Sequence, residues 1–216
     1  MASENILKKL SFADSFTIFN GLFGLFSIFC ILQHERYIAF IFILLAVLAD
    51  GMDGIMARRY GGYLGRYMDE FADIVSFLVA PCIFAYISYK IKFDPLFLLS
   101  SSLFLILGML HLINYHISKK DYFIGITTPA AAIIIASLSI LSFPLWIIYT
   151  SFIILAFLMV YPLPYPRVEK QFAAIACIII FLAMSGMKEF IIILLVSTLI
   201  YAIFGPIYVM NSRRNF

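Results

Sequence analysis

The feature that most constrains this chain is a succession of long apolar runs. Eight runs follow one another along the sequence, separated by short polar connections. A bilayer core about 30 Å thick needs roughly 20 apolar residues in a helix that crosses it. The fifth and seventh runs are short, so six or seven spans also fit the pattern. The runs cover Ser15–Leu32, Tyr37–Ala57, Met68–Tyr89, Pro95–Ile117, Thr127–Leu141, Pro144–Tyr161, Gln171–Gly186 and Glu189–Met210.

Composition narrows the class of protein in the same direction. Hydrophobic residues make up 64% of the chain and charged residues only 12%, whereas about a quarter of a soluble domain is charged. This excludes a soluble enzyme, a disordered chain and a nucleic-acid-binding module. No run alternates with the period of a strand, so we predict an all-α integral membrane protein, a polytopic helical bundle of about eight spans.

Basic residues are distributed unevenly between the two sides of the predicted bundle. With an even number of spans both termini share one side, and that side carries 11 of the 15 Lys and Arg residues. The positive-inside rule then places both termini, and the connection of residues 58–67, in the cytoplasm. The expected location is therefore the cytoplasmic membrane.

The chain before the first run mixes apolar and basic residues. We expect residues 1–14 to form a short interfacial segment, helical on the membrane surface, with a disordered tail as the alternative. Residues 15–216 are expected to form a single transmembrane domain. The residues that favour an interfacial helix are Ile6, Leu7, Leu10 and Phe12 among Lys8, Lys9 and Asp14.

Acidic residues gather in one short part of the sequence. Five of the 12 lie between positions 50 and 73. Asp50 and Asp53 are three residues apart at the end of the second run, and Asp69 and Asp73 are four apart at the start of the third. Residues at these spacings share one helix face. If the two helices are antiparallel neighbours, four carboxylates converge at one depth of the membrane.

Four converging carboxylates need protons or a cation, because like charges repel strongly at low dielectric. An all-oxygen ligand set suits Mg²⁺, Mn²⁺ or Ca²⁺ and not zinc. Gly54 and Ala57 leave the adjoining helix face bare for a bulky ligand, and Arg58 is a natural partner for phosphate. Together these residues indicate a diphosphate leaving group that is activated by a metal ion.

The spacing of these residues resembles a known family. Residues 50–73 read D-G-M-D-G-I-M-A-R, six further residues, then G-R-Y-M-D-E-F-A-D. This is similar to the pattern of the CDP-alcohol phosphatidyltransferases, D-x2-D-G-x2-A-R-x8-G-x3-D-x3-D. The connection between Arg58 and Gly65 has six residues where the family pattern has about eight, so it shortens the turn but leaves the four aspartates in register.

The resemblance implies a role for each residue of the pattern. The four aspartates would hold one or two Mg²⁺ or Mn²⁺ ions, and Asp73 would also be the general base. The resemblance also implies a six-span family core, here with two more spans, and a homodimer. The residues expected to contact CDP are Asn20, Asp50, Gly54, Ala57, Arg58, Gly65 and Asp69. For Asn20, which lies in the first run, a hydrogen bond to a neighbouring helix is an equal alternative.

Two further stretches resemble the membrane-bound serine transferases of this family. They are I-V-S-F-L-V-A-P at 74–81 and Y-F-I-G-I-T-T-P-A-A-A at 122–132. Those enzymes usually have R-L-A-R-F-N before the second stretch, and this chain has H-L-I-N-Y-H at 111–116. An interhelical hydrogen bond is the alternative role for His111. The candidates for contact with the acceptor or the lipid phosphate are His111, Asn114, Lys119, Lys120, Thr127 and Thr128.

The expected reaction is transfer of a phosphatidyl or archaetidyl group from CDP-diacylglycerol or CDP-archaeol to the hydroxyl of L-serine, with release of CMP. Inositol phosphate, glycerol phosphate and choline are alternative acceptors. An alternative from another class is a metal ion or proton transporter, but that function needs carboxylates spread through the depth of the bilayer. The expected partners are the CDP-lipid, the small alcohol and membrane lipids, with no nucleic acid.

Overall fold

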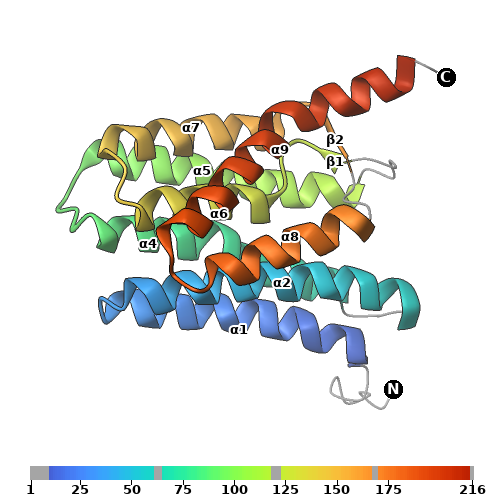
Figure 1. Cartoon of the computed structure of the whole chain (residues 1–216), viewed down its shortest axis with the longest axis horizontal. Helices are drawn as coiled ribbons and strands as arrows, with labels where there is room; N and C mark the ends of the chain where they lie inside the picture. The colour runs from blue at the N-terminus through green and yellow to red at the C-terminus, as the bar shows by residue number, and fades with distance from the viewer. Residues whose placement is uncertain (1–9, 61–64, 118–122, 167–169, 215–216) are drawn as a thin grey trace, which may run out of the picture.

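The computed structural model describes residues 10–60, 65–117, 123–166 and 170–214, and within them all side chains except those of 12–13, 53–60, 65–67, 115–117, 123, 170–171 and 212–214. Helices form nearly all of the described chain (Figure 1). In chain order the elements are α1 (Phe12–Leu32), α2 (Arg36–Tyr60), α3 (Gly65–Asp73), the π-helical turn η2 (Ile74–Val79), α4 (Ala80–Ser88), α5 (Pro95–Ile117), β1 (Phe123–Ile124), α6 (Thr128–Ile140), α7 (Leu145–Val160), β2 (Pro164–Tyr165), α8 (Lys170–Ala183) and α9 (Lys188–Arg214).

Each of the eight predicted runs corresponds to a helical segment in the described residues. The third run is a continuous segment made of α3, η2 and α4. By length and composition, four described segments can each cross a membrane alone: Asp14–Leu32, Met68–Ser88, Pro95–Asn114 and Lys188–Asn211. The predicted all-α polytopic membrane fold is confirmed.

Helix α6 occupies the centre of the bundle. Eleven of its 13 residues are buried, and it packs against α2, α4, η2, α7 and α9. At 1.5 Å per residue it is only about 20 Å long, which is less than the thickness of a bilayer core. A short helix is tolerated here because neighbouring helices cover most of its side chains.

The first described helix begins and the last one finishes at the same end of the bundle. Helix α1 begins and α9 finishes at the end where α2 finishes and where β1 and β2 lie (Figure 1). This agrees with the predicted even number of crossings. That this side faces the cytoplasm stays a prediction.

Helix α1 begins with a capping box. The Ser11 side chain accepts a hydrogen bond from the Asp14 backbone N–H, and the Asp14 carboxylate accepts one from the Ser11 N–H at 2.7 Å. Such reciprocal bonds satisfy backbone donors that the first turn leaves open. Asp14 therefore belongs to the first turn of α1, while residues 1–9 of the predicted interfacial segment lie outside the described residues.

The π-helical turn η2 follows directly after Asp73. The Ala80 backbone N–H donates to the Val75 carbonyl, five residues back. Glycines lie against this turn from two helices: a Cβ added to Gly24 would lie 2.7 Å from the Ser76 Cα, and one added to Gly108 would lie 2.5 Å from Leu78 Cδ2. The wide turn therefore fills the space that Gly24 of α1 and Gly108 of α5 leave open.

Candidate active site

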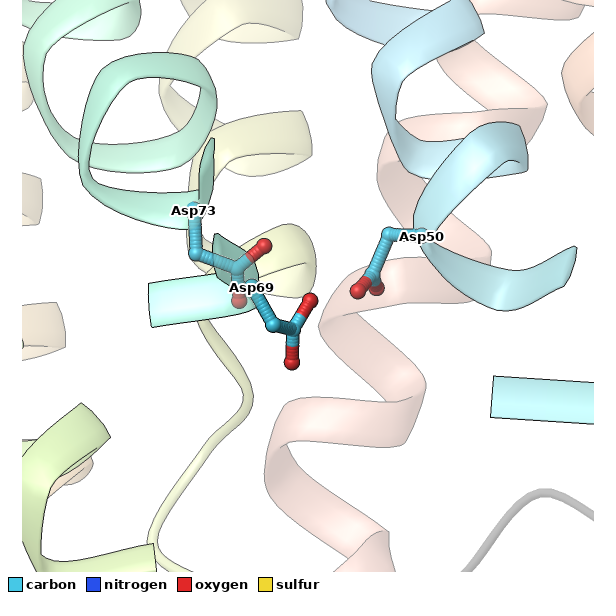
Figure 2. Close-up of side chains that lie close together, drawn as sticks. All are labelled: Asp50, Asp69 and Asp73. Atoms are coloured by element: carbon cyan, nitrogen blue, oxygen red, sulfur yellow. The ribbon is translucent and has the colours of Figure 1, made fainter. Parts of the chain in front are cut away.

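Three of the four predicted aspartates converge in the structure. Asp50 comes from α2, whereas Asp69 and Asp73 come from α3. One carboxylate oxygen from each lies within 4.8 Å of the others, and the three side chains point toward one another (Figure 2). Asp50 and Asp69 are half-buried, and Asp73 is only 6% exposed. The structure thus brings one carboxylate of the second run and two of the third together.

Helix α1 explains why these aspartates meet. It packs against both α2 and α3, so it holds the end of one helix beside the start of the other. Asp69 and Asp73 are one helical turn apart and share a face of α3. Because Gly21 of α1 lies against Ala72, α3 approaches α1 closely at the level of the carboxylates.

The three carboxylates fit a hard divalent cation. Oxygen-only ligands are those that Mg²⁺, Mn²⁺ and Ca²⁺ prefer. Three carboxylates this close in a poorly solvated site also repel one another unless a proton or a cation lies among them. The described residues therefore form a candidate metal centre of the predicted kind.

Asp73 also contacts the first helix. The Asn20 side chain is fully buried, and its Nδ2 donates a hydrogen bond of 2.8 Å to Asp73 Oδ1. The interhelical hydrogen bond that the sequence left open for Asn20 is therefore present, and its partner is a carboxylate of the cluster.

Several predicted contacts cannot be placed by their side chains. The backbones of 53–58 lie in the last part of α2, and Gly65 is the first residue of α3. The structure does not describe the side chains of Asp53, Ala57 and Arg58 or the surroundings of Gly54 and Gly65. Lys119 and Lys120 also lie outside the described residues. Their roles stay predictions.

The acceptor candidates that are described lie on α5 and at the start of α6. His111 is buried, and its Nδ1 lies 2.7 Å from the Met159 carbonyl oxygen of α7. Because a carbonyl can only accept, Nδ1 carries the hydrogen and donates it. The interhelical alternative for His111 is thus present in the structure. Asn114 is exposed, Thr127 is the N-cap residue of α6, and Thr128 is 2% exposed.

A two-residue antiparallel ladder, which the sequence did not predict, fixes the start of α6. Phe123 pairs with Tyr165, and Ile124 pairs with Pro164. Next to the ladder, the Gly125 N–H donates to the Leu163 carbonyl at 2.8 Å. Gly125 has φ +84°, and a Cβ there would lie 1.9 Å from the Met159 carbonyl oxygen. Only glycine fits at this position, so the stretch around Thr127 is held against the loop that follows α7.

Ser76 is a site residue that the sequence reasoning did not single out. It is fully buried in η2, and its Oγ donates to the Asn20 carbonyl oxygen at 2.8 Å. Its signal in the sequence is its place three residues after Asp73, within the stretch at 74–81 that resembles the serine transferases.

Comparison with known proteins agrees with this geometry. The family model for CDP-alcohol phosphatidyltransferase matches residues 10–163, which contain all three clustered aspartates. The CDP-diacylglycerol–serine O-phosphatidyltransferase of Methanocaldococcus jannaschii is 32% identical over 94% of this chain and 96% of its own length. The enzyme of the same name from Bacillus subtilis is 33% identical over 73% of this chain and 90% of its own.

A third relative is named for an archaeal lipid. The archaetidylserine synthase of Methanothermobacter thermautotrophicus is 30% identical over 82% of this chain and 78% of its own length. The match to the family model covers well over half of the chain. The carboxylate cluster, the helical membrane fold and these similarities agree: the chain belongs to the CDP-alcohol phosphatidyltransferase family.

Proposed function

We propose that this protein transfers a phosphatidyl or archaetidyl group from a CDP-linked lipid to the hydroxyl of L-serine and releases CMP. The observation that carries this proposal is the convergence of Asp50, Asp69 and Asp73 within 4.8 Å, in a chain whose relatives are named for serine transfer. The lipid donor is CDP-diacylglycerol or its diether analogue CDP-archaeol. This chain is similar both to a relative named for CDP-diacylglycerol and to one named for archaetidylserine.

In this reaction Asp73 takes the proton of the serine hydroxyl. The serine oxygen then forms a bond to the lipid-linked phosphorus, the bond from that phosphorus to the CMP oxygen breaks, and CMP leaves with the electron pair. Asp73 suits the role of base because it is the most buried of the three acids, and a fixed hydrogen bond from Asn20 holds one of its oxygens. Such positioning is the main contribution of a protein to phosphoryl transfer.

The four aspartates Asp50, Asp53, Asp69 and Asp73 form the proposed metal site. Mg²⁺ or Mn²⁺ bound there would neutralise the diphosphate and stabilise the charge that develops on the leaving CMP. Asp50 and Asp69 would also border the nucleotide, together with Gly54, Ala57, Arg58 and Gly65. Arg58 can pair with a phosphate oxygen through its planar guanidinium.

For the serine carboxylate we propose a site in residues 114–128. Lys119 and Lys120 supply positive charge there, and Thr127 and Thr128 lie at the N-terminus of α6, where backbone N–H groups favour an anion. His111 is assigned no direct contact with the carboxylate, because its side chain is buried and, with Nδ1 donating to Met159, the neutral ring has only the acceptor Nε2 left. Cytoplasmic orientation of this end and a homodimeric assembly remain predictions.

The test is an acceptor screen on the purified protein in detergent. CDP-diacylglycerol or CDP-archaeol is supplied with Mn²⁺ or Mg²⁺ and, separately, with serine, inositol phosphate, glycerol phosphate or choline. We expect CMP release in the reaction that contains serine and none in the reactions with the other three acceptors. Release with another acceptor and not with serine would leave the family reaction intact and reject the proposed substrate.

The proposed base is tested with Asp73→Asn, which keeps the size of the side chain but cannot accept the proton. We expect a loss of more than about 100-fold in kcat, the lower range of losses for a general base. Glu70→Gln is the matched control, because it removes one negative charge from the same helix at a residue that is not one of the three clustered acids. Full activity of Asp73→Asn would exclude the proposed base. Metal-driven uptake into proteoliposomes without nucleotide would favour the transporter alternative.

A further inference from the structure

Helix α1 brings no carboxylate to the described cluster, yet it makes a direct contact with Asp73. Asn20 Nδ2 donates to Asp73 Oδ1 at 2.8 Å, and both side chains are buried. A carboxylate can only accept, so this bond also fixes which way the Asn20 amide points. With Oδ1 held by the amide, the Asp73 carboxylate cannot rotate freely. The position of its other oxygen, Oδ2, is therefore fixed as well.

A second hydrogen bond fixes Asn20 itself. Ser76 Oγ donates to the Asn20 carbonyl oxygen at 2.8 Å. Ser76 lies three residues after Asp73, so one residue of α1 is bonded to two residues of the segment that carries the acid. Buried hydrogen bonds of this kind hold a geometry firmly, because breaking one leaves a polar group unsatisfied.

The backbones of α1 and η2 are in close contact beside these two hydrogen bonds. A Cβ added to Gly24 would lie 2.3 Å from Ser76 Oγ and 2.7 Å from the Ser76 Cα. One turn earlier, a Cβ added to Gly21 would meet Ala72 at an ordinary 3.5 Å. The closest approach of α1 is therefore to the π-helical turn, one turn beyond Asp73.

The π-helical turn determines which way Asp73 faces. An extra residue in one turn of a 3.6-residue helix rotates the preceding part by about 100° relative to the part that follows. Without η2, Asp69 and Asp73 would therefore face a different direction relative to the buried face of α4. The Ser76–Asn20 bond and the Gly24 contact lie on this turn.

The Asn20 side chain has little left to offer a nucleotide. Its Nδ2 is occupied by Asp73. Its Oδ1 is buried, with no hydrogen-bond partner in the part of the chain that the structure describes. A nucleotide could reach that oxygen only by displacing protein atoms.

We propose that Asn20 is a positioning residue that orients the Asp73 carboxylate, and that Ser76 and Gly24 hold Asn20 in place across the π-helical turn. This inference rests on the proposed function, in which Asp73 accepts the hydroxyl proton. It replaces the nucleotide contact expected for Asn20 with a role exerted through Asp73. Asn20 aligns the acid and does not add to the affinity for CDP.

The test separates kcat from KM in Asn20→Leu, which keeps the volume of the side chain and removes its donor. We expect kcat with serine to fall by about 100-fold, the order of loss for a reacting group displaced by roughly 1 Å. The KM for CDP-lipid should stay unchanged. The dissociation constant for CMP, measured by calorimetry with Mn²⁺ present, should stay unchanged as well.

A second variant keeps the test valid if Asn20→Leu folds poorly. Ser76→Ala removes the bond to the Asn20 carbonyl and leaves the Asn20 side chain in place, so kcat should fall by a smaller factor, again with KM unchanged. A rise in KM or weaker CMP binding with an unchanged kcat would establish Asn20 as a nucleotide contact and overturn the proposal. Wild-type kcat in both variants would also overturn it.

The two proposals fail in different ways. If Asp73→Asn abolishes activity while Asn20→Leu and Ser76→Ala keep wild-type kcat, the base stands and the positioning role is wrong. If Asp73→Asn is fully active, the proposed base is wrong whatever the Asn20 variants do.

Discussion

The two ends of the bundle use their polar side chains in opposite ways. At one end, carboxylates of Asp50, Asp69 and Asp73 point toward one another. At the other end, Arg36 donates to the Ser139 carbonyl at 2.6 Å and to Ser88 Oγ at 3.3 Å. There the charged group binds the last turn of α6 and the end of α4.

The difference separates groups that stabilise the fold from groups that serve a ligand. At the Arg36 end, the guanidinium adds a charged donor to the Ser139 carbonyl near the end of α6, which also accepts a hydrogen bond from the Ser142 N–H. The carboxylate end gathers like charges, which destabilise the folded protein unless something neutralises them. Substitutions at the Arg36 end should therefore lower stability, and substitutions at the carboxylate end should lower activity.

The largest expected effect is at the carboxylate end. Asp50→Asn should reduce kcat/KM by more than about 100-fold, beyond the loss typical of residues that only support metal ligands. It should also remove the stabilisation that Mn²⁺ gives the wild type, which is about 2.7 kcal/mol at a concentration 100 times the dissociation constant. Thermal unfolding with Mn²⁺ and with a chelator measures this. An equal Mn²⁺-induced shift in Tm in both proteins would argue against Asp50 as a ligand.

A substitution at the Arg36 end should change the stability of the protein and not its activity. Arg36→Leu should lower the free energy of unfolding by about 1.5–3 kcal/mol, the range for hydrogen bonds made by a charged group, because the bonds from the guanidinium to the Ser139 carbonyl and to Ser88 Oγ are lost. Activity at saturating substrate should not change. Lys92→Leu is the control, since Lys92 is exposed at the same end. A loss of kcat in Arg36→Leu would remove the distinction between the two ends.

Two glycines of α1 sharpen the comparison within a single helix. Gly24→Ala should cost about 1–3 kcal/mol, the range for overpacking, because the new Cβ meets the Ser76 backbone at 2.7 Å. Gly21→Ala meets Ala72 at 3.5 Å, so the helical preference of alanine should make it neutral or stabilising by up to about 1 kcal/mol. Chemical denaturation in detergent compares the two. Equal stabilities would show that α1 and η2 are not in tight contact.

The smallest effect concerns Asp94, beside the start of α5. A hydrogen bond from the Tyr149 hydroxyl, with the N–H groups of Leu96 and Phe97, holds the pKa of Asp94 below its usual value of 3.8. The ionised acid thus stabilises the fold above that value, and the contribution disappears as the pH falls through the lower pKa of the folded protein. Tyr149→Phe should lower Tm slightly and equally from pH 6 to pH 8. A difference that grows with pH in this range would contradict the assignment.

Much of the fold follows from the sequence because hydrophobic length is a local property. A run such as Pro95–Ile117 is apolar for long enough to predict one helix and its ends, and α5 has those bounds. The carboxylate cluster was predictable for a related reason. The spacing of Asp69 and Asp73 sets a shared face, and a short connection after the second run brings Asp50 close to them.

The parts that were not predicted depend on contacts between distant residues. Nothing in the residues of η2 marks a π-helical turn, because the packing of Gly24 and Gly108 against it determines its shape. The partner of Asn20 is 53 residues away, so the sequence could offer only alternatives. The ladder between β1 and β2 is two residues long, which is too short for a periodic signal.

Helix α6 has a consequence for how the protein is made. Helix α6 is shorter than the bilayer core is thick, and its neighbours cover it. Its stability in the membrane therefore depends on those neighbours. One of those neighbours is α9, which is synthesised after α6 and α7. The central helix is therefore fully covered only after α9 has been synthesised, and a nascent chain halted after α7 would leave one side of α6 open to lipid.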